Sequence, residues 1–117
     1  MRFDFGLYMH KDWHPSWAFE VIDWPDFGLP ADPEQAAAQI ASAFHRAKGG
    51  DRVEVGCAEG LGRTGTVLAC MAILSGVPAE KAVDWVRDHY DPRAVETSDQ
   101  EGWAAWFGRY VESSDCV

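Results

Sequence analysis

Hydrophobic positions along the chain follow two periods, one typical of strands and one typical of helices. Short stretches rich in β-branched and aromatic residues occur at Phe3–Tyr8, Phe19–Asp23 and Val53–Gly56, and we expect a strand at each. Between and after them, apolar residues recur every three or four positions, which predicts amphipathic helices. Strands that alternate with helices indicate an α/β fold of three layers, with a short, mostly parallel sheet flanked by helices.

Capping residues, prolines and glycines mark the helix ends. Asp32-Pro33-Glu34 combines an N-cap, a proline at the first helical position and an acidic first turn, so a helix should run from there to Lys48. A second helix should begin near Arg63 and run to Leu74.

Two further helices are expected in the last third of the chain. One should run from Pro78 to Tyr90, with Ala82, Val86 and Tyr90 on its inward face. The other begins near Ser98, and its aromatic side chains fall at helical spacing, which favours a core-facing stripe. That stripe consists of Trp103, Trp106, Phe107 and Tyr110.

Length, charge and cysteine content limit the number of domains, the binding partners and the location that we expect. The chain has 117 residues, of which 47% are hydrophobic, and this suits one compact domain over 1–117. Its formal net charge of -9 disfavours binding to nucleic acid or to an anionic membrane. The N-terminus lacks the apolar stretch of a signal peptide, so we expect a cytoplasmic protein. Three cysteines without a CxxC or Cys/His pairing argue against a disulfide framework or a metal site, and we expect no cofactor.

The strongest chemical signal is a glycine-containing loop between an expected strand and an expected helix, with Cys57 and Arg63 at its two ends. At a helix N-terminus, unpaired N–H groups and the helix dipole favour a bound dianion and lower the pKa of a thiol. Arg63 supplies a planar fork for two phosphate oxygens. The loop is therefore predicted to hold a phosphate beside a thiolate nucleophile. Its expected phosphate-binding residues are Ala58, Glu59, Gly60, Leu61, Gly62 and Arg63.

Cys57, five intervening residues, Arg63 and Thr64 resemble the signature of the cysteine-dependent protein tyrosine phosphatase superfamily. The segment WPDFGLP at 24–30 resembles that family's mobile loop, which carries a general-acid aspartate. The resemblance covers Trp24 to about Trp106 and implies the family's fold. It also implies that Cys57 is the nucleophile, that Arg63 binds phosphate, that Asp26 is the general acid, and that the Thr64 hydroxyl hydrogen-bonds the departing thiolate.

Gln100 has two interpretations. The segment at 94–100 is similar to a stretch that carries a water-positioning glutamine in several family members. Thr97-x-x-Gln100 before an aromatic helix is equally a capping box, in which the glutamine only satisfies the helix N-terminus.

Two residues depart from the family pattern. Gly56 stands where most members have a histidine that helps to keep the thiol ionised. Glu59 lies in the loop itself, where its carboxylate would repel additional phosphates of a highly phosphorylated lipid or inositol.

The expected activity is hydrolysis of phosphotyrosine in a phosphorylated protein or peptide, with dual specificity left open. Gly56 keeps a phosphotyrosine-binding pseudophosphatase as an alternative, and a phosphatase of small phosphorylated metabolites is another. A rhodanese-like sulfur carrier would not predict the 24–30 loop, and low-molecular-weight phosphatases place their cysteine loop near the N-terminus. The physiological substrate, the regulation and the oligomeric state stay open.

The other reactive side chains have simpler interpretations. His10 and His14 suit a solvated loop, while His45 and His89 should lie near helix C-termini. Cys70 lies in an apolar helix and should pack in the core, with a role as a resolving thiol as the alternative. Cys116 lies in the tail of the sequence and should be inert.

Overall fold

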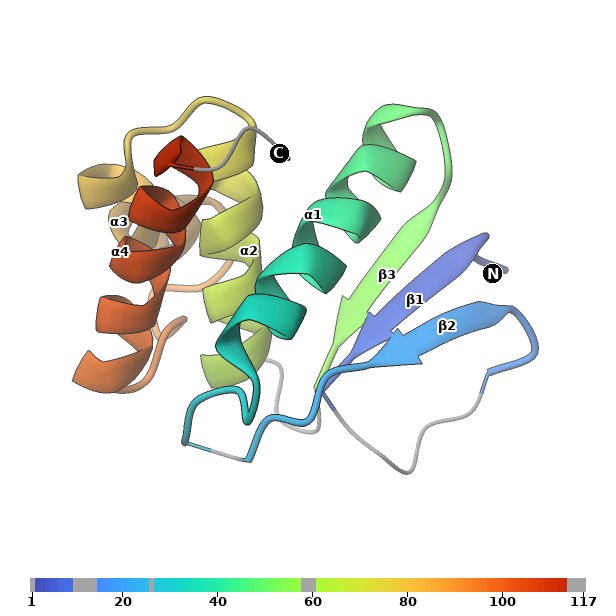
Figure 1. Cartoon of the computed structure of the whole chain (residues 1–117), viewed down its shortest axis with the longest axis horizontal. Helices are drawn as coiled ribbons and strands as arrows, with labels where there is room; N and C mark the ends of the chain where they lie inside the picture. Colours follow the sequence, from blue (N-terminus) through green and yellow to red (C-terminus); the bar gives the residue numbers. More distant parts are fainter. Residues whose placement is uncertain (1, 10–14, 26, 58–60, 114–117) are drawn as a thin grey trace.

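The computed structural model describes residues 2–9, 15–25, 27–57 and 61–113. Strands and helices lie where the sequence predicts them, within two residues at most ends (Figure 1). The element order is β1 (Phe5–Tyr8), β2 (Ala18–Val21), α1 (Pro33–Lys48), β3 (Val53–Gly56), α2 (Gly62–Leu74), α3 (Ala79–His89) and α4 (Ser98–Ser113).

The sheet is parallel, with β1 in the centre and the order β2-β1-β3. Phe5 pairs with Ala18 on one side and with Val53 on the other. β1 begins two residues later than expected because its partner strands begin opposite Phe5. Since all three strands run the same way, their carboxyl ends meet at one edge of the sheet, and Met9, the 22–30 segment and Cys57 all follow from that edge.

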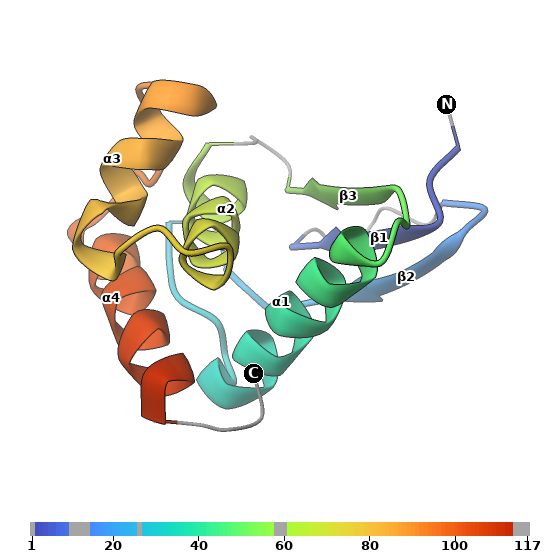
Figure 2. The same ribbon diagram turned by 90° about the horizontal axis from the view of Figure 1, so that it is seen from above.

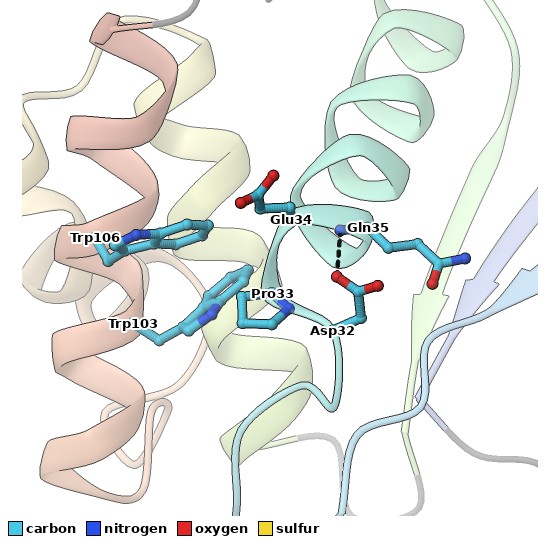
Figure 3. A pocket seen from close by; sticks show the side chains of 6 residues that line it. All are labelled: Asp32, Pro33, Glu34, Gln35, Trp103 and Trp106. Atoms are coloured by element: carbon cyan, nitrogen blue, oxygen red, sulfur yellow. Dashed lines mark hydrogen bonds between the residues drawn. The ribbon is translucent and has the colours of Figure 1, made fainter.

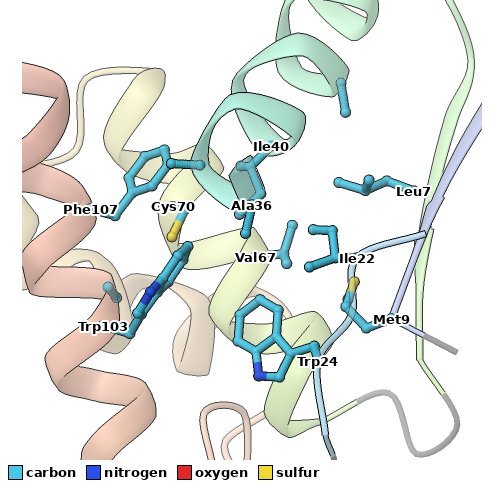
Figure 4. Close-up of a cluster of buried hydrophobic side chains, with 14 of the residues drawn as sticks. Leu7, Met9, Ile22, Trp24, Ala36, Ile40, Val67, Cys70, Trp103 and Phe107 are labelled. Atoms are coloured by element: carbon cyan, nitrogen blue, oxygen red, sulfur yellow. The ribbon is translucent and has the colours of Figure 1, made fainter. Parts of the chain in front are cut away.

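The helices stack beside the sheet in two further layers. α1 and α2 lie next to the strands, and α3 and α4 lie beyond α2 (Figures 1 and 2). The core fills the space between α1, α2, α4 and the sheet, where side chains such as Leu7, Ile40, Val67 and Phe107 are fully buried (Figure 4). The α/β class with a short parallel sheet is thereby confirmed.

α1 begins as its capping residues predict. The Asp32 carboxylate accepts a hydrogen bond from the Gln35 N–H at 3.1 Å, and Pro33 is the first helical residue (Figure 3). A hollow of about 520 Å³ lies between this helix start and Trp103 and Trp106 of α4. The same view shows the side chains that line it. Trp103 and Phe107 are buried, while Trp106 is partly exposed at the hollow, so the aromatic stripe does face the core.

One expectation for α3 is wrong. Ala82 and Val86 are buried as predicted, but Tyr90 is 47% exposed. The helix ends at His89, so Tyr90 lies at the C-cap and no longer follows the inward face.

Candidate functional site

The candidate site lies where β3 leads into α2. Cys57 directly follows β3 and is partly buried, and Arg63 and Thr64 lie in the first turn of α2. The N-cap position of α2 is Leu61, whose side chain cannot accept a hydrogen bond from that turn. A helix start without a side-chain cap, beside a thiol, suits a bound anion. The predicted loop residues Ala58, Glu59 and Gly60 and the predicted acid Asp26 lie outside the described residues.

Thr64 binds the thiol directly. Its Oγ1 donates a hydrogen bond to Cys57 Sγ at 3.0 Å, and the Thr64 side chain is buried. A hydrogen bond of this kind stabilises the ionised sulfur more than the neutral one. The geometry expected for these two residues is therefore present.

Arg63 connects three segments at the edge of the sheet. Its side chain is 7% exposed, and its Nη1 donates to Met9 O at 2.8 Å and to Trp24 O at 3.0 Å. Met9 follows β1, and Trp24 opens the 24–30 segment. The arginine of the cysteine loop thus holds the 24–30 segment beside the start of α2.

Two hydrogen bonds link Gly28 to the start of the 24–30 segment. Gly28 N donates to Pro25 O at 3.0 Å, and Trp24 Nε1 donates to Gly28 O at 2.8 Å. Phe27 has a φ of 58°, which is uncommon for a residue with a side chain. The Trp24 ring packs against Trp103 at 5.3 Å between centroids, so the turn rests on the core.

Gln100, in the first turn of α4, is fully buried against the 24–30 segment. Its Oε1 accepts from Glu96 N at 3.0 Å, and its Nε2 donates to Gly28 O at 3.4 Å. Its backbone N–H donates to Thr97 Oγ1 at 3.1 Å, as in a capped helix start. These bonds match the capping interpretation and also tie α4 to the 24–30 turn. A water-positioning role for Gln100 stays a prediction.

The connection between α3 and α4 supports the cysteine loop from behind, which the sequence analysis missed. Val95 has a φ of 62°, and its N–H donates to Leu61 O at 3.0 Å. Arg87 holds this strained turn, because its Nε donates to Ala94 O at 2.9 Å and its Nη2 donates to Val95 O at 2.8 Å. These hydrogen bonds join segments that are separated in the sequence, so no local sequence pattern predicts them.

Glu96 is a second residue that the sequence analysis missed. A methyl group added at Gly62 would collide with the Glu96 carboxylate, which shows that this carboxylate lies directly over the start of α2. Glu96 therefore brings negative charge close to the phosphate loop.

Tyr90 is a third residue that the sequence analysis did not connect with the cysteine. Burial raises the pKa of the Tyr90 phenol, and the negative charges of Cys57 and Asp91 raise that pKa further. The charge of the cysteine thus acts on a side chain at the end of α3, although α3 and β3 are far apart in the sequence.

Removing the Cys57 charge is expected to lower the pKa of Tyr90. In Cys57→Ser the hydroxyl stays neutral, so one of the three causes of the raised pKa disappears. The measurement is a spectrophotometric titration of the phenolate band, with Tyr90→Phe in each background to isolate the Tyr90 signal. An identical Tyr90 titration in the two backgrounds would contradict the placement of this residue beside the cysteine.

The remaining candidates take the simpler interpretations. Cys70 is fully buried in the core, and burial raises its pKa well above the ordinary value, which confirms a packing role. His45 and His89 lie in the last turns of α1 and α3, as expected. His10, His14 and Cys116 lie outside the described residues.

In the described part of the chain, no helix is both long and apolar enough to span a membrane. Within the same residues, no group of three or more histidine, cysteine or acidic side chains is arranged to hold a metal ion.

Two crystal structures are similar to this fold. One is the structure of Tk-PTP in the active form, with a TM-score of 0.73 and 27% identity over 92% of this chain and 79% of that chain. A mutant form of Tk-PTP gives a TM-score of 0.76 over 96% of this chain and 81% of that chain, and its 24% identity shows the fold alone.

Curated relatives include proteins of unknown function and a known phosphatase. An uncharacterized protein of Methanocaldococcus jannaschii, MJECL20, is 36% identical over 76% of this chain, and the chain spans 65% of that relative's length. A second uncharacterized protein of that organism, MJ0215, is 34% identical over 76% of this chain, and the chain spans 60% of that relative's length. The human receptor-type tyrosine-protein phosphatase C is 41% identical over 56% of this chain, which corresponds to 5% of that receptor.

The family model for protein-tyrosine phosphatase matches residues 6–93. That range contains all of β1 except its first residue, and the whole of β2, β3, the 24–30 segment, the cysteine loop and α2. The chain therefore belongs to the protein-tyrosine phosphatase family.

Proposed function

We propose that this protein hydrolyses phosphotyrosine in proteins or peptides through a cysteinyl-phosphate formed on Cys57. The observation that carries the proposal is the hydrogen bond of 3.0 Å from Thr64 Oγ1 to Cys57 Sγ at the start of α2. It supports an ionised sulfur at an anion-binding helix terminus, in a chain where the histidine of most family members is replaced by Gly56.

In the first step, the Cys57 thiolate attacks phosphorus and forms an S–P bond while the bond from phosphorus to the tyrosine oxygen breaks. Asp26, as the acid, gives its proton to the departing oxygen. The Arg63 guanidinium and the loop amides stabilise charge on the equatorial oxygens. Because Nη1 donates to two carbonyls, a bidentate contact with phosphate would use the Nε and Nη2 edge of Arg63.

In the second step, water attacks phosphorus and the S–P bond breaks, which releases inorganic phosphate and regenerates the thiolate. The Asp26 carboxylate takes the proton from that water, so the acid is restored for the next cycle. The Thr64 hydroxyl stabilises the departing thiolate through the same hydrogen bond. Every proton that leaves one group in this cycle is received by another.

The charges of the chain support a substrate with one phosphate. Glu59 in the loop, the Glu96 carboxylate over Gly62 and the net charge of -9 all oppose a polyphosphate or an anionic membrane surface. Exposed Phe27 beside Asp26 offers an apolar contact for a phenyl ring.

Asp26→Ala is expected to slow hydrolysis of a phosphotyrosyl peptide by about 10²- to 10⁴-fold. It should slow an activated aryl phosphate much less, because a nitrophenolate leaves without protonation. The test is kcat on both substrates, with Asp84→Ala on the surface of α3 as a matched control that should keep both rates. Equal losses on the two substrates would remove Asp26 from the acid role.

A substrate panel separates the proposal from its alternatives. Phosphotyrosyl, phosphoseryl and phosphothreonyl peptides of one sequence are compared with inositol phosphates and sugar phosphates by kcat/KM. The proposal requires the phosphotyrosyl peptide to lead. Higher kcat/KM for a small metabolite phosphate would replace it, and tight peptide binding without turnover would indicate a pseudophosphatase.

A further inference from the structure

A second hollow, of about 370 Å³, lies between α2 and α3. Its walls include Leu68, Met71 and Ala72 from α2, and Trp85, Val86 and Tyr90 from α3 and its C-cap. This volume is near the lower end of the range for ligand pockets, and the lining is mostly apolar. The hollow therefore suits one large apolar side chain better than a polar metabolite.

The exposed hydrophobic side chains of the described residues are not scattered. The large ones are Phe27 and Leu29 in the 24–30 segment, with 58% and 39% exposure, and Trp85 and Tyr90 at the α2–α3 hollow, with 40% and 47% exposure. Contiguous apolar surface on a small protein commonly marks a binding site. Phe27 and Leu29 follow Trp24, whose O accepts from Arg63, and Tyr90 begins the connection whose Val95 N–H donates to Leu61 O.

The hollow lies at the start of the connection that supports the cysteine loop, because Tyr90 both lines the hollow and caps α3. This side chain lines the hollow, and the next residues lead directly to Val95, whose N–H donates to Leu61 O at 3.0 Å. The Cys57 anion is also one cause of the raised pKa of Tyr90, after burial. A polypeptide bound with its phosphate at Cys57 thus has the mouth of the hollow beside it.

We propose that the α2–α3 hollow is a substrate subsite that receives a large apolar side chain of the phosphorylated polypeptide, near its phosphotyrosine. This inference rests on the proposed function and adds a sequence preference to it. The occupant is the substrate polypeptide itself, because Tyr90 of the hollow begins the connection whose Val95 N–H donates to Leu61 O of the cysteine loop.

The experiment uses phosphotyrosyl peptides in a glycine and serine background, in which one leucine is moved through the positions on both sides of the phosphotyrosine. At one position the wild type should show a kcat/KM about tenfold higher for leucine than for serine. The ratio is taken within one enzyme, so changes in the phosphate chemistry cancel.

Two substitutions test where this preference arises. Trp85→Ala removes an exposed wall and Met71→Trp fills the hollow, and each should reduce the leucine-to-serine ratio to about twofold or less. Trp106→Ala is the matched control, because it removes a tryptophan from the other hollow, at the start of α1, and should leave the ratio unchanged.

The outcomes separate the subsite from the proposed function. No leucine preference at any position, or a preference that survives both Trp85→Ala and Met71→Trp, overturns the subsite and leaves phosphotyrosine hydrolysis intact. Absence of turnover for every peptide contradicts the proposed function, and the subsite falls with it. A ratio that also collapses in Trp106→Ala would assign the preference to general loosening of the fold.

Discussion

Replacing Cys57 with serine is expected to lower kcat for any aryl phosphate by at least about 10⁴-fold. A serine hydroxyl remains protonated where a thiol ionises, and the hydrogen bond from Thr64 Oγ1, at 3.0 Å in the wild type, then faces a neutral oxygen. Phosphate binding should persist, because the arginine and the helix start remain. Steady-state hydrolysis and phosphate titration of the folded variant measure the two effects separately.

Cys70→Ala provides the matched control for this cysteine. Cys70 is buried in the core, away from the phosphate chemistry, so kcat should stay within about twofold while stability falls by about 1 kcal/mol. If Cys57→Ser retained a tenth of the wild-type rate, the cysteine would not be the nucleophile.

Arg63→Lys is expected to lower kcat/KM by about 10²- to 10³-fold. A lysine ammonium lacks the planar fork that meets two phosphate oxygens, and it cannot reproduce the bonds to Met9 O and Trp24 O at the same time. Since those bonds fix the 24–30 segment, the free energy of unfolding of the variant, measured by denaturant titration, should also fall by about 1–3 kcal/mol.

The surface arginine Arg52 supplies the comparison for Arg63. Its side chain is 61% exposed, so Arg52→Lys should change neither kcat/KM nor stability measurably. An Arg63→Lys variant with wild-type kcat/KM would show that the guanidinium fork has no part in binding the transition state.

Much of the fold could be predicted because its signals are local. Asp32 and Pro33 predict the start of α1, and the spacing of Trp103 and Phe107 predicts the buried face of α4. In the same way, the spacing of Cys57 and Arg63 predicted that both lie at the start of α2. The family resemblance, not the spacing, implied the bond between Thr64 and Cys57, and the structure has those partners.

The supporting turn could not be predicted because it depends on contacts between distant segments. A positive φ is unfavourable for a valine. At Val95 it is held by two hydrogen bonds, one from Arg87 to Val95 O and one from the Val95 N–H to Leu61 O. Gly65 also depends on a contact with a distant segment. On its own, a glycine inside a helix costs about 1 kcal/mol of stability relative to alanine. A methyl group there would lie 2.9 Å from both Ala94 Cβ and Val95 N, which explains the glycine.

The exposure of Tyr90 also followed from tertiary structure. Helical spacing placed it inward, but the bonds of Arg87 to Ala94 and Val95 belong to a connection that turns toward the cysteine loop as soon as α3 ends. The residue that helical periodicity assigned to the core instead lines the hollow between α2 and α3.

Trapping the covalent intermediate would show whether Cys57 carries the phosphoryl group during turnover. The wild type is mixed with an excess of an activated aryl phosphate, quenched in acid during turnover, digested and examined by mass spectrometry. The proposed mechanism predicts one phosphoryl group on the peptide that contains Cys57, and none in Cys57→Ser. Phosphate release in the wild type with no phosphoryl group on that peptide, or with the group on another residue, would contradict it.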